Sequence, residues 1–191
     1  MTKLSRNHRS GGAGCFPRNS PVLTPTGQIP IGEISPNDWI LSWCEATSTL
    51  AARRVIKRID KPSCPIWCLM TDDGSTIETT FAHTFLTKRG WIRAFRLRSG
   101  DVLLGSDGRD TSNKTVLKFV YTGRSEVVSN LITAWDNNFV VGGIVAHNFS
   151  FLRLFRRMLW QVRAITVRPP VIRGRPAGPP RTLEGLRAAG N

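Results

Sequence analysis

An internal duplication constrains the fold of this chain more than any other feature of the sequence. Residues 23–41 align with residues 86–104 without a gap, at a constant offset of 63. The identical pairs are Leu23/Leu86, Thr24/Thr87, Gly27/Gly90, Ile29/Ile92, Asp38/Asp101 and Leu41/Leu104. Such self-similarity indicates one structural unit used twice. Each unit is predicted to contain a strand, a turn with Gly, a second strand, and an Asp that leads into a hydrophobic strand.

The other segments of residues 15–148 also favour strands over helices. β-Branched and aromatic residues flank an Asp-Gly turn at 72–75, which predicts a β-hairpin there. The further strands expected from the sequence are 53–59, 66–71, 76–80, 113–123 and 126–134. A turn of helix is expected only around 93–100. The sequence therefore predicts an all-β domain with a duplicated, pseudo-twofold arrangement and short helical turns only.

The charge of the chain is concentrated in its flanks. The net charge is +14, and residues 149–191 contribute nine Arg against one Glu. Residues 1–14 carry three basic residues and no acid, whereas residues 15–148 have a nearly balanced composition. We therefore expect an N-terminal flank, a central domain and a basic C-terminal flank. No secretory signal and no apolar run of membrane-spanning length is present, which favours the cytoplasm.

The C-terminal flank contains two patterns. Phe151, Phe155, Met158 and Val162 are spaced by four, three and four residues, with Arg side chains between them. This spacing predicts a basic amphipathic helix, and the Pro/Arg/Gly-rich residues 168–182 predict disorder. Such a tail suits an anionic membrane or a nucleic acid. The alternative is a solvated appendage without a partner.

The cysteines do not indicate a metal site or a disulfide scaffold. Three residues separate Cys64 from Cys68, but no second pair of Cys or His accompanies them, so we expect neither a metal nor another cofactor. Four cysteines in a chain of this length are too few for a small disulfide-stabilised fold. A role for Cys15 has to be sought elsewhere.

Cys15 follows the unhindered Gly14 at the start of the predicted domain. Its thiol can attack the Gly14 carbonyl carbon, which moves the acyl group from nitrogen to sulfur. A free cysteine has a pKa of about 8.5, so some thiolate is present at neutral pH. The step requires an oxyanion donor and a proton for the departing nitrogen. Thr80 is the candidate donor, and His83, three residues later, is the candidate general acid.

Asn148 ends the predicted domain, next to His147. Its carboxamide can close on its own main-chain carbonyl and form a succinimide, which cuts the chain before Phe149. An amide is a poor nucleophile, and enforced proximity supplies the rate. His147 can donate a hydrogen bond to the scissile carbonyl or protonate the leaving amine. Asp101 is a further candidate for orienting the site, although Asp38 at the equivalent position favours a turn role for both.

Together, these residues resemble the Hint domain of Hedgehog autoprocessing domains and inteins, and most of all the bacterial intein-like domains. Cys15 corresponds to the family's first-residue nucleophile, and "TFAH" (80–83) to its Thr-x-x-His motif. "GWIRAFRLRSGDVLL" (90–104) resembles the second copy of its duplicated subdomain, and "NFVVGGIVAHN" (138–148) its closing block. The resemblance covers residues 15–148. It implies a horseshoe of β-strands that brings both chain ends to one site.

The sequence departs from the intein pattern in ways that bear on activity. Inteins follow the final Asn with Cys, Ser or Thr, but here Phe149 follows. The resemblance therefore implies single-turnover self-cleavage, with splicing at a low level only. Asp136 is the expected helper near the C-terminal bond, and Asn137 replaces a histidine that is frequent there. Asn37 stands where the family often has Gly. Neither a homing-endonuclease insert nor a sterol-binding region is present.

Self-processing implies a limited set of partners. The domain is expected to act in cis on its own flanks as a monomer, with an external thiol or water as acyl acceptor. The alternative hypothesis is a non-catalytic β-barrel module that binds nucleic acid through its basic tail. Binding of residues 15–148 alone to DNA, lost at high salt, would favour that alternative.

Overall fold

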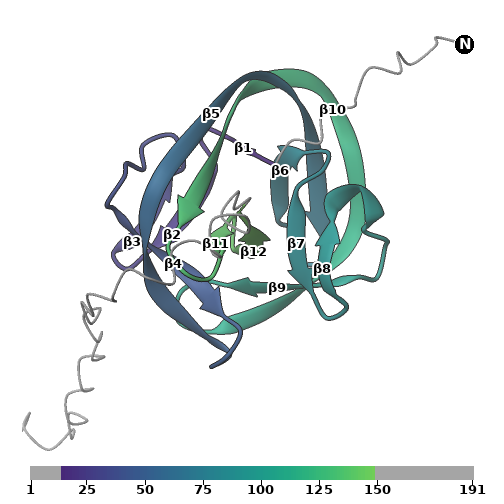
Figure 1. Ribbon diagram of the computed structural model, residues 1–191. Helices are drawn as coiled ribbons and strands as arrows, with labels where there is room; N and C mark the ends of the chain where they lie inside the picture. The colour runs from purple at the N-terminus through teal and green to yellow at the C-terminus, as the bar shows by residue number, and fades with distance from the viewer. Residues whose placement is uncertain (1–13, 149–191) are drawn as a thin grey trace, which may run out of the picture. The chain divides into compact units, whose positions relative to one another are not determined.

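The computed structural model describes residues 14–148 and confirms an all-β fold (Figure 1). Within these residues the only helical segment is the short 3-10 turn η1 (Ala94–Arg96). The strands are β1 (Phe16–Pro17), β2 (Pro21–Thr24), β3 (Gly27–Pro30), β4 (Trp39–Cys44), β5 (Thr49–Thr71), β6 (Thr76–Thr80), β7 (Thr84–Thr87), β8 (Gly90–Arg93), β9 (Val102–Ser106), β10 (Thr111–Thr133), β11 (Asn138–Val141) and β12 (Ile144–His147). The amphipathic helix and the disordered tail expected beyond residue 148 lie outside the described residues.

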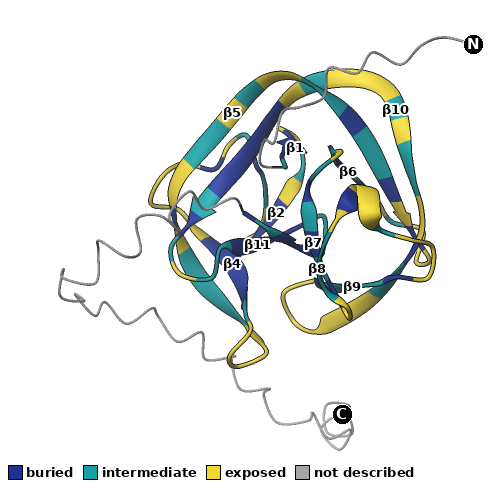
Figure 2. Ribbon diagram, turned by 45° about the vertical axis from the view of Figure 1, so that its right-hand side comes forward, coloured by how far each residue is buried: buried dark blue, intermediate teal, exposed yellow. Residues whose placement is uncertain are grey.

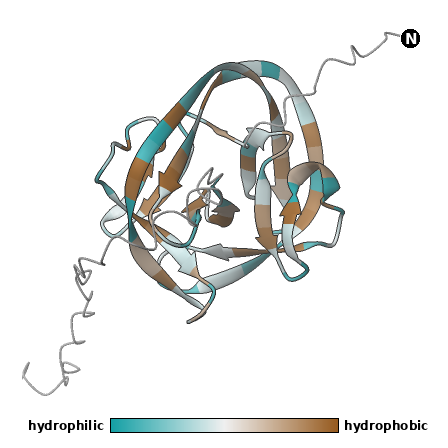
Figure 3. Ribbon diagram, viewed as in Figure 1, coloured by the Kyte–Doolittle hydropathy of each residue, from teal (hydrophilic) through white to brown (hydrophobic). Residues whose placement is uncertain are grey.

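Two long strands dominate the architecture. β5 and β10 have 23 residues each and pair antiparallel along most of their length, arching together over the domain (Figure 1). Figure 3 shows hydrophobic and hydrophilic bands along both strands, as expected for strands with one solvated face. The predicted hairpin is confirmed, because the end of β5 pairs with β6 across residues 72–75.

The prediction of separate short strands at 113–123 and 126–134 was wrong. Both belong to β10, and the predicted strands 53–59 and 66–71 both belong to β5. Gly123 has a φ of +82°, and the pairing shifts register between Tyr121 and Ser125. A local irregularity of this kind lets a strand bend without ending. The sequence signals for turns therefore mark bends within long strands.

The duplication appears as matching hydrogen bonds in the two halves. The Thr24 hydroxyl donates to the Gly27 carbonyl at 2.7 Å, and the Thr87 hydroxyl donates to the Gly90 carbonyl at 2.8 Å. Both glycines have positive φ values, of +135° and +88°. The same side-chain bond thus closes the same turn at the 63-residue offset, which supports one structural unit used twice.

The repeated aspartates also make the same contact. The Ser35 N–H donates to Asp38 Oδ2 at 2.7 Å, and the Arg98 N–H donates to Asp101 Oδ2 at 2.8 Å. Each carboxylate closes the loop that leads into the following strand, which is the turn role that the repeat favoured.

Asn37 and Gly100 occupy equivalent left-handed positions beside these aspartates. Their φ values are +78° and +89°, and their N–H groups donate to the carbonyls of Val55 and Val116. Asn tolerates this backbone region better than most other residues that carry a Cβ. The Asn at position 37 therefore fits where the family often has Gly.

The core lies beneath the arch, around β11 and β12. Every residue of β11 is buried, and Figure 2 shows this strand in the colour of buried residues. β12 pairs with β11 on one side and with β7 on the other, so it ends in the interior. Phe16 contacts Phe85 and Phe139 with ring centroids 6.2 and 6.0 Å apart. This packing holds the N-terminal strand β1 against β7 and β11.

No helix among the described residues is long and apolar enough to cross a membrane.

Candidate self-processing site

The structure brings both ends of the domain to one strand. The Asn130 side chain donates to the Gly14 carbonyl at 2.5 Å, and the Asn148 side chain donates to the Thr133 hydroxyl at 2.8 Å. Asn130 and Thr133 are neighbours on β10, and three residues of a strand span roughly 10 Å. The N-terminal and C-terminal bonds therefore lie within one small region.

The backbone of Cys15 is fixed by the strand that carries the Thr-x-x-His motif. The Cys15 N–H donates to Thr80 Oγ1 at 2.9 Å. The Cys15 carbonyl accepts from the Thr80 N–H and from the Thr79 hydroxyl, both at 3.0 Å. This arrangement holds the Gly14–Cys15 amide in a defined orientation.

The Cys15 thiol is buried among apolar side chains, with 1% of the residue exposed. Its cluster includes Ile66, Val128 and the partly buried Cys64. Burial raises the pKa of Cys15 to about 11, against a smaller opposing effect of the Lys61 ammonium. The Cys15 thiol is therefore neutral at neutral pH, and it must lose its proton before it can react as a thiolate.

His83 is fully buried beside the same bond. Its ring packs on Phe16 with centroids 4.1 Å apart. Burial lowers the pKa of His83 to about 3, although the nearby Gly14 backbone favours the protonated ring. At neutral pH the imidazole is therefore neutral. It can receive a proton from one group and pass it to another.

Gly14 fits against His83 without room for a side chain. A Cβ at this position would lie 2.2 Å from His83 Cα and 2.3 Å from its Nδ1. Real Cβ atoms essentially never approach other atoms so closely. The residue before the nucleophile must therefore be Gly unless His83 and its loop move.

Sequence reasoning missed Asn130, and it assigned the oxyanion role to Thr80. Asn130 is the side chain that contacts the scissile carbonyl oxygen, whereas the Thr80 hydroxyl accepts from the amide N–H of the same bond. The available signal was a lone carboxamide in the β-branched stretch "VVSNLIT" (127–133), where a buried polar group needs a partner. That partner comes from residue 14, which no local pattern identifies.

An Asn130→Ala variant is expected to slow N-terminal cleavage by about 100- to 1,000-fold. Loss of one preformed oxyanion donor has effects of this size in acyl transfer. The rate is measured by mass analysis of the fragments that end at Gly14. Cleavage after Asn148 in the same sample provides the internal control, and an equal loss at both bonds would indicate general unfolding instead.

Asn148 is completely buried at the end of β12. Its N–H donates to the Asn137 carbonyl at 2.8 Å, which extends the pairing of β11 with β12. Its Nδ2 is held by Thr133, while Oδ1 has no hydrogen-bond partner among the described residues. Asn137 thus contributes through its backbone, in a left-handed conformation with φ of +53°.

His147 precedes Asn148 and is half-buried. Its ring lies edge-on to Trp91, with centroids 5.0 Å apart. A charge on His147 also disfavours protonation of His83, so the two imidazoles are close enough to interact electrostatically. Both histidines that the sequence singled out therefore belong to the same region. Phe149 lies outside the described residues.

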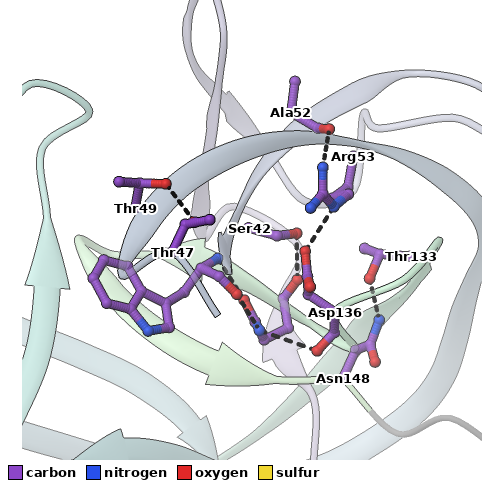
Figure 4. A network of polar contacts seen from close by, with 10 residues as sticks. Ser42, Thr47, Thr49, Ala52, Arg53, Thr133, Asp136 and Asn148 are labelled. Atoms are coloured by element: carbon purple, nitrogen blue, oxygen red, sulfur yellow. Dashed lines mark hydrogen bonds and ion pairs between the residues drawn. The ribbon is translucent and has the colours of Figure 1, made fainter. Parts of the chain in front are cut away.

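Asp136, the expected helper, is engaged by Arg53. The Arg53 Nε–H donates to its Oδ2 at 2.6 Å, and Figure 4 shows this pair close to Thr133 and Asn148. The Asp136 carbonyl accepts from the Asn138 side chain at 3.1 Å. These contacts fix the turn that precedes β11 and so support the segment that binds the Asn148 N–H.

Asp101 makes a structural ion pair. Arg89 donates to both of its oxygens, at 2.8 and 2.7 Å, and these bonds hold the pKa of Asp101 below its usual range. The pair closes the second copy of the duplicated unit. Among residues 14–148, no group of three or more His, Cys, Asp or Glu is arranged to hold a metal ion.

Comparison with known proteins places this geometry in a family. A family model described as "Pretoxin HINT domain" matches residues 21–149. The DnaB intein from Synechocystis sp. PCC 6803 superposes with a TM-score of 0.67 at 23% identity, covering 72% of this chain and 99% of that chain. A search of curated proteins gave no match.

Two further solved structures have the same fold. The bacterial intein-like domain from Clostridium thermocellum gives a TM-score of 0.62 at 26% identity, over 70% of this chain and 98% of that chain. The DnaX mini intein from Spirulina platensis gives 0.63 at 21% identity, over 70% and 99%. The predicted Hint fold is therefore confirmed.

Proposed function

The chain belongs to the pretoxin HINT domain family, and from this premise we propose that it cleaves its own flanks. An N–S acyl shift at Gly14–Cys15 forms a thioester, and cyclisation of Asn148 cuts the chain before Phe149. Each bond is cleaved once per molecule. The observation that carries the proposal is the binding of both scissile ends by neighbouring residues of β10.

In the first step the Cys15 thiol adds to the Gly14 carbonyl carbon. The developing oxyanion lies where Asn130 already donates a hydrogen bond. The C–N bond then breaks, the acyl group remains on sulfur, and the Cys15 nitrogen becomes a free amine. His83 transfers the proton from the thiol to this nitrogen, and Thr80 holds the amide in place meanwhile. An external thiol or water then releases residues 1–14 from the thioester.

In the second step Asn148 Nδ2 adds to the carbonyl carbon of Asn148. The peptide bond to Phe149 breaks, and a succinimide forms on the upstream fragment. Nδ2 passes one proton to the His147 ring, and the ring delivers one proton to the departing amine of Phe149, so His147 ends the step unchanged. Thr133 holds the attacking carboxamide in one orientation. Less rotational freedom is therefore lost when the carboxamide attacks.

Residue 149 favours cleavage over splicing. Phe149 has no nucleophilic side chain, so the thioester cannot pass to it by a branched ester. Attack by the freed Phe149 amine on the thioester remains as a slow route to ligation. The word "pretoxin" in the family description fits a domain that releases its downstream segment, here the basic residues 149–191.

Mass analysis of purified protein under denaturing conditions tests the proposal. We expect fragments that break at Gly14/Cys15 and at Asn148/Phe149 and that accumulate with time. Added thiol or hydroxylamine should accelerate only the first break, because only that step passes through a thioester. A full-length chain that stays intact under these conditions would contradict the proposed function.

A further inference from the structure

The buried side-chain atoms without hydrogen-bond partners all belong to the candidate site. Among the described residues these atoms are Nδ1 and Nε2 of His83 and Oδ1 of Asn148, and the polar backbone of Gly14 also lies beside the His83 ring. Both residues are completely buried. Native proteins leave few buried polar groups unpaired, because each costs about 1–3 kcal/mol. Two such residues in one domain, at positions 83 and 148, require an explanation.

The sheet register brings these two residues together. β12 pairs antiparallel with β7, with Ala146 opposite Phe85. In an antiparallel ladder the numbers of opposed residues have a constant sum. Continued by two residues, which is one residue beyond the end of each strand, this register would place His83 opposite Asn148.

The backbone hydrogen bonds support side-chain contact between them. The His83 carbonyl accepts from the Ala94 N–H at 2.6 Å, on the side away from β12. The Asn148 N–H donates to the Asn137 carbonyl, on the side away from β7. Opposed residues whose polar backbone groups point apart form a non-hydrogen-bonded pair, with Cα atoms about 4.5 Å apart and side chains on the same face.

We propose that His83 is also a positioning residue for Asn148, whose Oδ1 accepts a hydrogen bond from the His83 ring, directly or through one buried water. A neutral imidazole carries one N–H, which suits a carboxamide oxygen. Thr133 already holds Nδ2, so the second contact fixes the plane of the carboxamide. The inference rests on the proposed function, because it concerns the attack that Asn148 makes.

This arrangement gives one imidazole two roles. On one side His83 contacts Gly14, the residue of the N-terminal bond, and on the other it faces the carboxamide of the C-terminal bond. Fixing Oδ1 directs Nδ2 toward the main-chain carbonyl of Asn148. Cleavage before Phe149 should therefore depend on a residue that the sequence motif assigns to the other bond.

The experiment measures cleavage before Phe149 in a Cys15→Ala background, in which the N-terminal step is absent. His83→Phe removes the donor and keeps a ring, whereas His83→Gln keeps an N–H donor. We expect His83→Phe to lower the rate constant about tenfold and His83→Gln to restore most of it. Cys64→Ala is the matched control, because Cys64 packs in the same cluster as residue 15, and it should leave the rate unchanged.

The outcomes separate the inference from the proposed function. If Cys15→Ala protein does not cleave before Phe149 at all, the proposed function fails. If it cleaves, and the rate is the same with His, Gln or Phe at position 83, only the inference fails.

A crystal structure of Cys15→Ala, His147→Ala protein, which also lacks the proton donor for the break before Phe149, tests the contact without a change at His83. A ring nitrogen within about 3.2 Å of Asn148 Oδ1, or one water within that distance of both, would support the inference. Absence of both would overturn it, even if His83→Phe protein failed to fold.

Discussion

A Cys15→Ala chain is expected to stay joined at residues 14 and 15 while it still breaks before Phe149. Alanine has no nucleophilic side chain, so no thioester forms and hydroxylamine has no thioester to cleave. The effect is complete loss of one break, measured as the absence of fragments that end at Gly14. Cys64→Ala is the matched control, because Cys64 packs in the same apolar cluster. A break at Gly14/Cys15 that persists in Cys15→Ala protein would exclude this assignment.

The pH dependence of the same break follows from the burial of the thiol. The pKa of Cys15 is raised to about 11 and that of His83 is lowered to about 3, so both groups are neutral between about pH 5 and pH 9. In this range His83 takes the thiol proton within the site, so the rate of thioester formation should be nearly independent of pH. A rate that rises about tenfold per pH unit through this range would indicate attack by free thiolate instead of proton transfer through His83.

An Asn148→Ala chain is expected to lose the C-terminal break completely and to keep the N-terminal one. Cyclisation uses the carboxamide itself, and well-oriented intramolecular attack can contribute about 7–11 kcal/mol to lowering a barrier. Without the carboxamide, only background hydrolysis of an ordinary peptide bond remains. Mass analysis should detect no fragment that begins at Phe149.

Asn148→Gln is the matched variant for this prediction. Gln keeps the carboxamide but adds one methylene, in a site with no exposed surface and with its Nδ2 bonded to Thr133. The longer side chain displaces the attacking nitrogen, so cleavage should be severely slowed. Equal rates for Asn148→Gln and the parent would show that the geometry of the carboxamide does not control the step.

Several parts of the fold could be predicted because local chemistry determines them. The Asp-Gly turn at 72–75 identifies a hairpin whatever surrounds it. The repeated Thr-x-x-Gly turns, at Thr24 and Thr87, are closed by bonds within four residues of chain. The domain limits at residues 15 and 148 stay a prediction, drawn from Cys15 and the His-Asn pair at 147–148.

Other parts depended on contacts between distant segments. Gly123 indicates a turn by its residue type, but pairing of β10 with β5 continues past it. The partner of Asp136 is Arg53, 83 residues away, and nothing in the local sequence identifies it. The same holds for Asn130, whose carboxamide contacts Gly14 across 116 residues.

The sequence by itself determined the all-β character of the domain and its duplication, and it predicted a nucleophile at each end. Those features follow from periodicity, turn chemistry and residue type, which act over a few residues. Only the tertiary structure decided which side chains lie at the two ends: Asn130 on the Gly14 carbonyl, Thr133 on the Asn148 carboxamide, and His83 against Gly14. Sheet register brings these residues together, and register is set by burial and pairing across the whole domain.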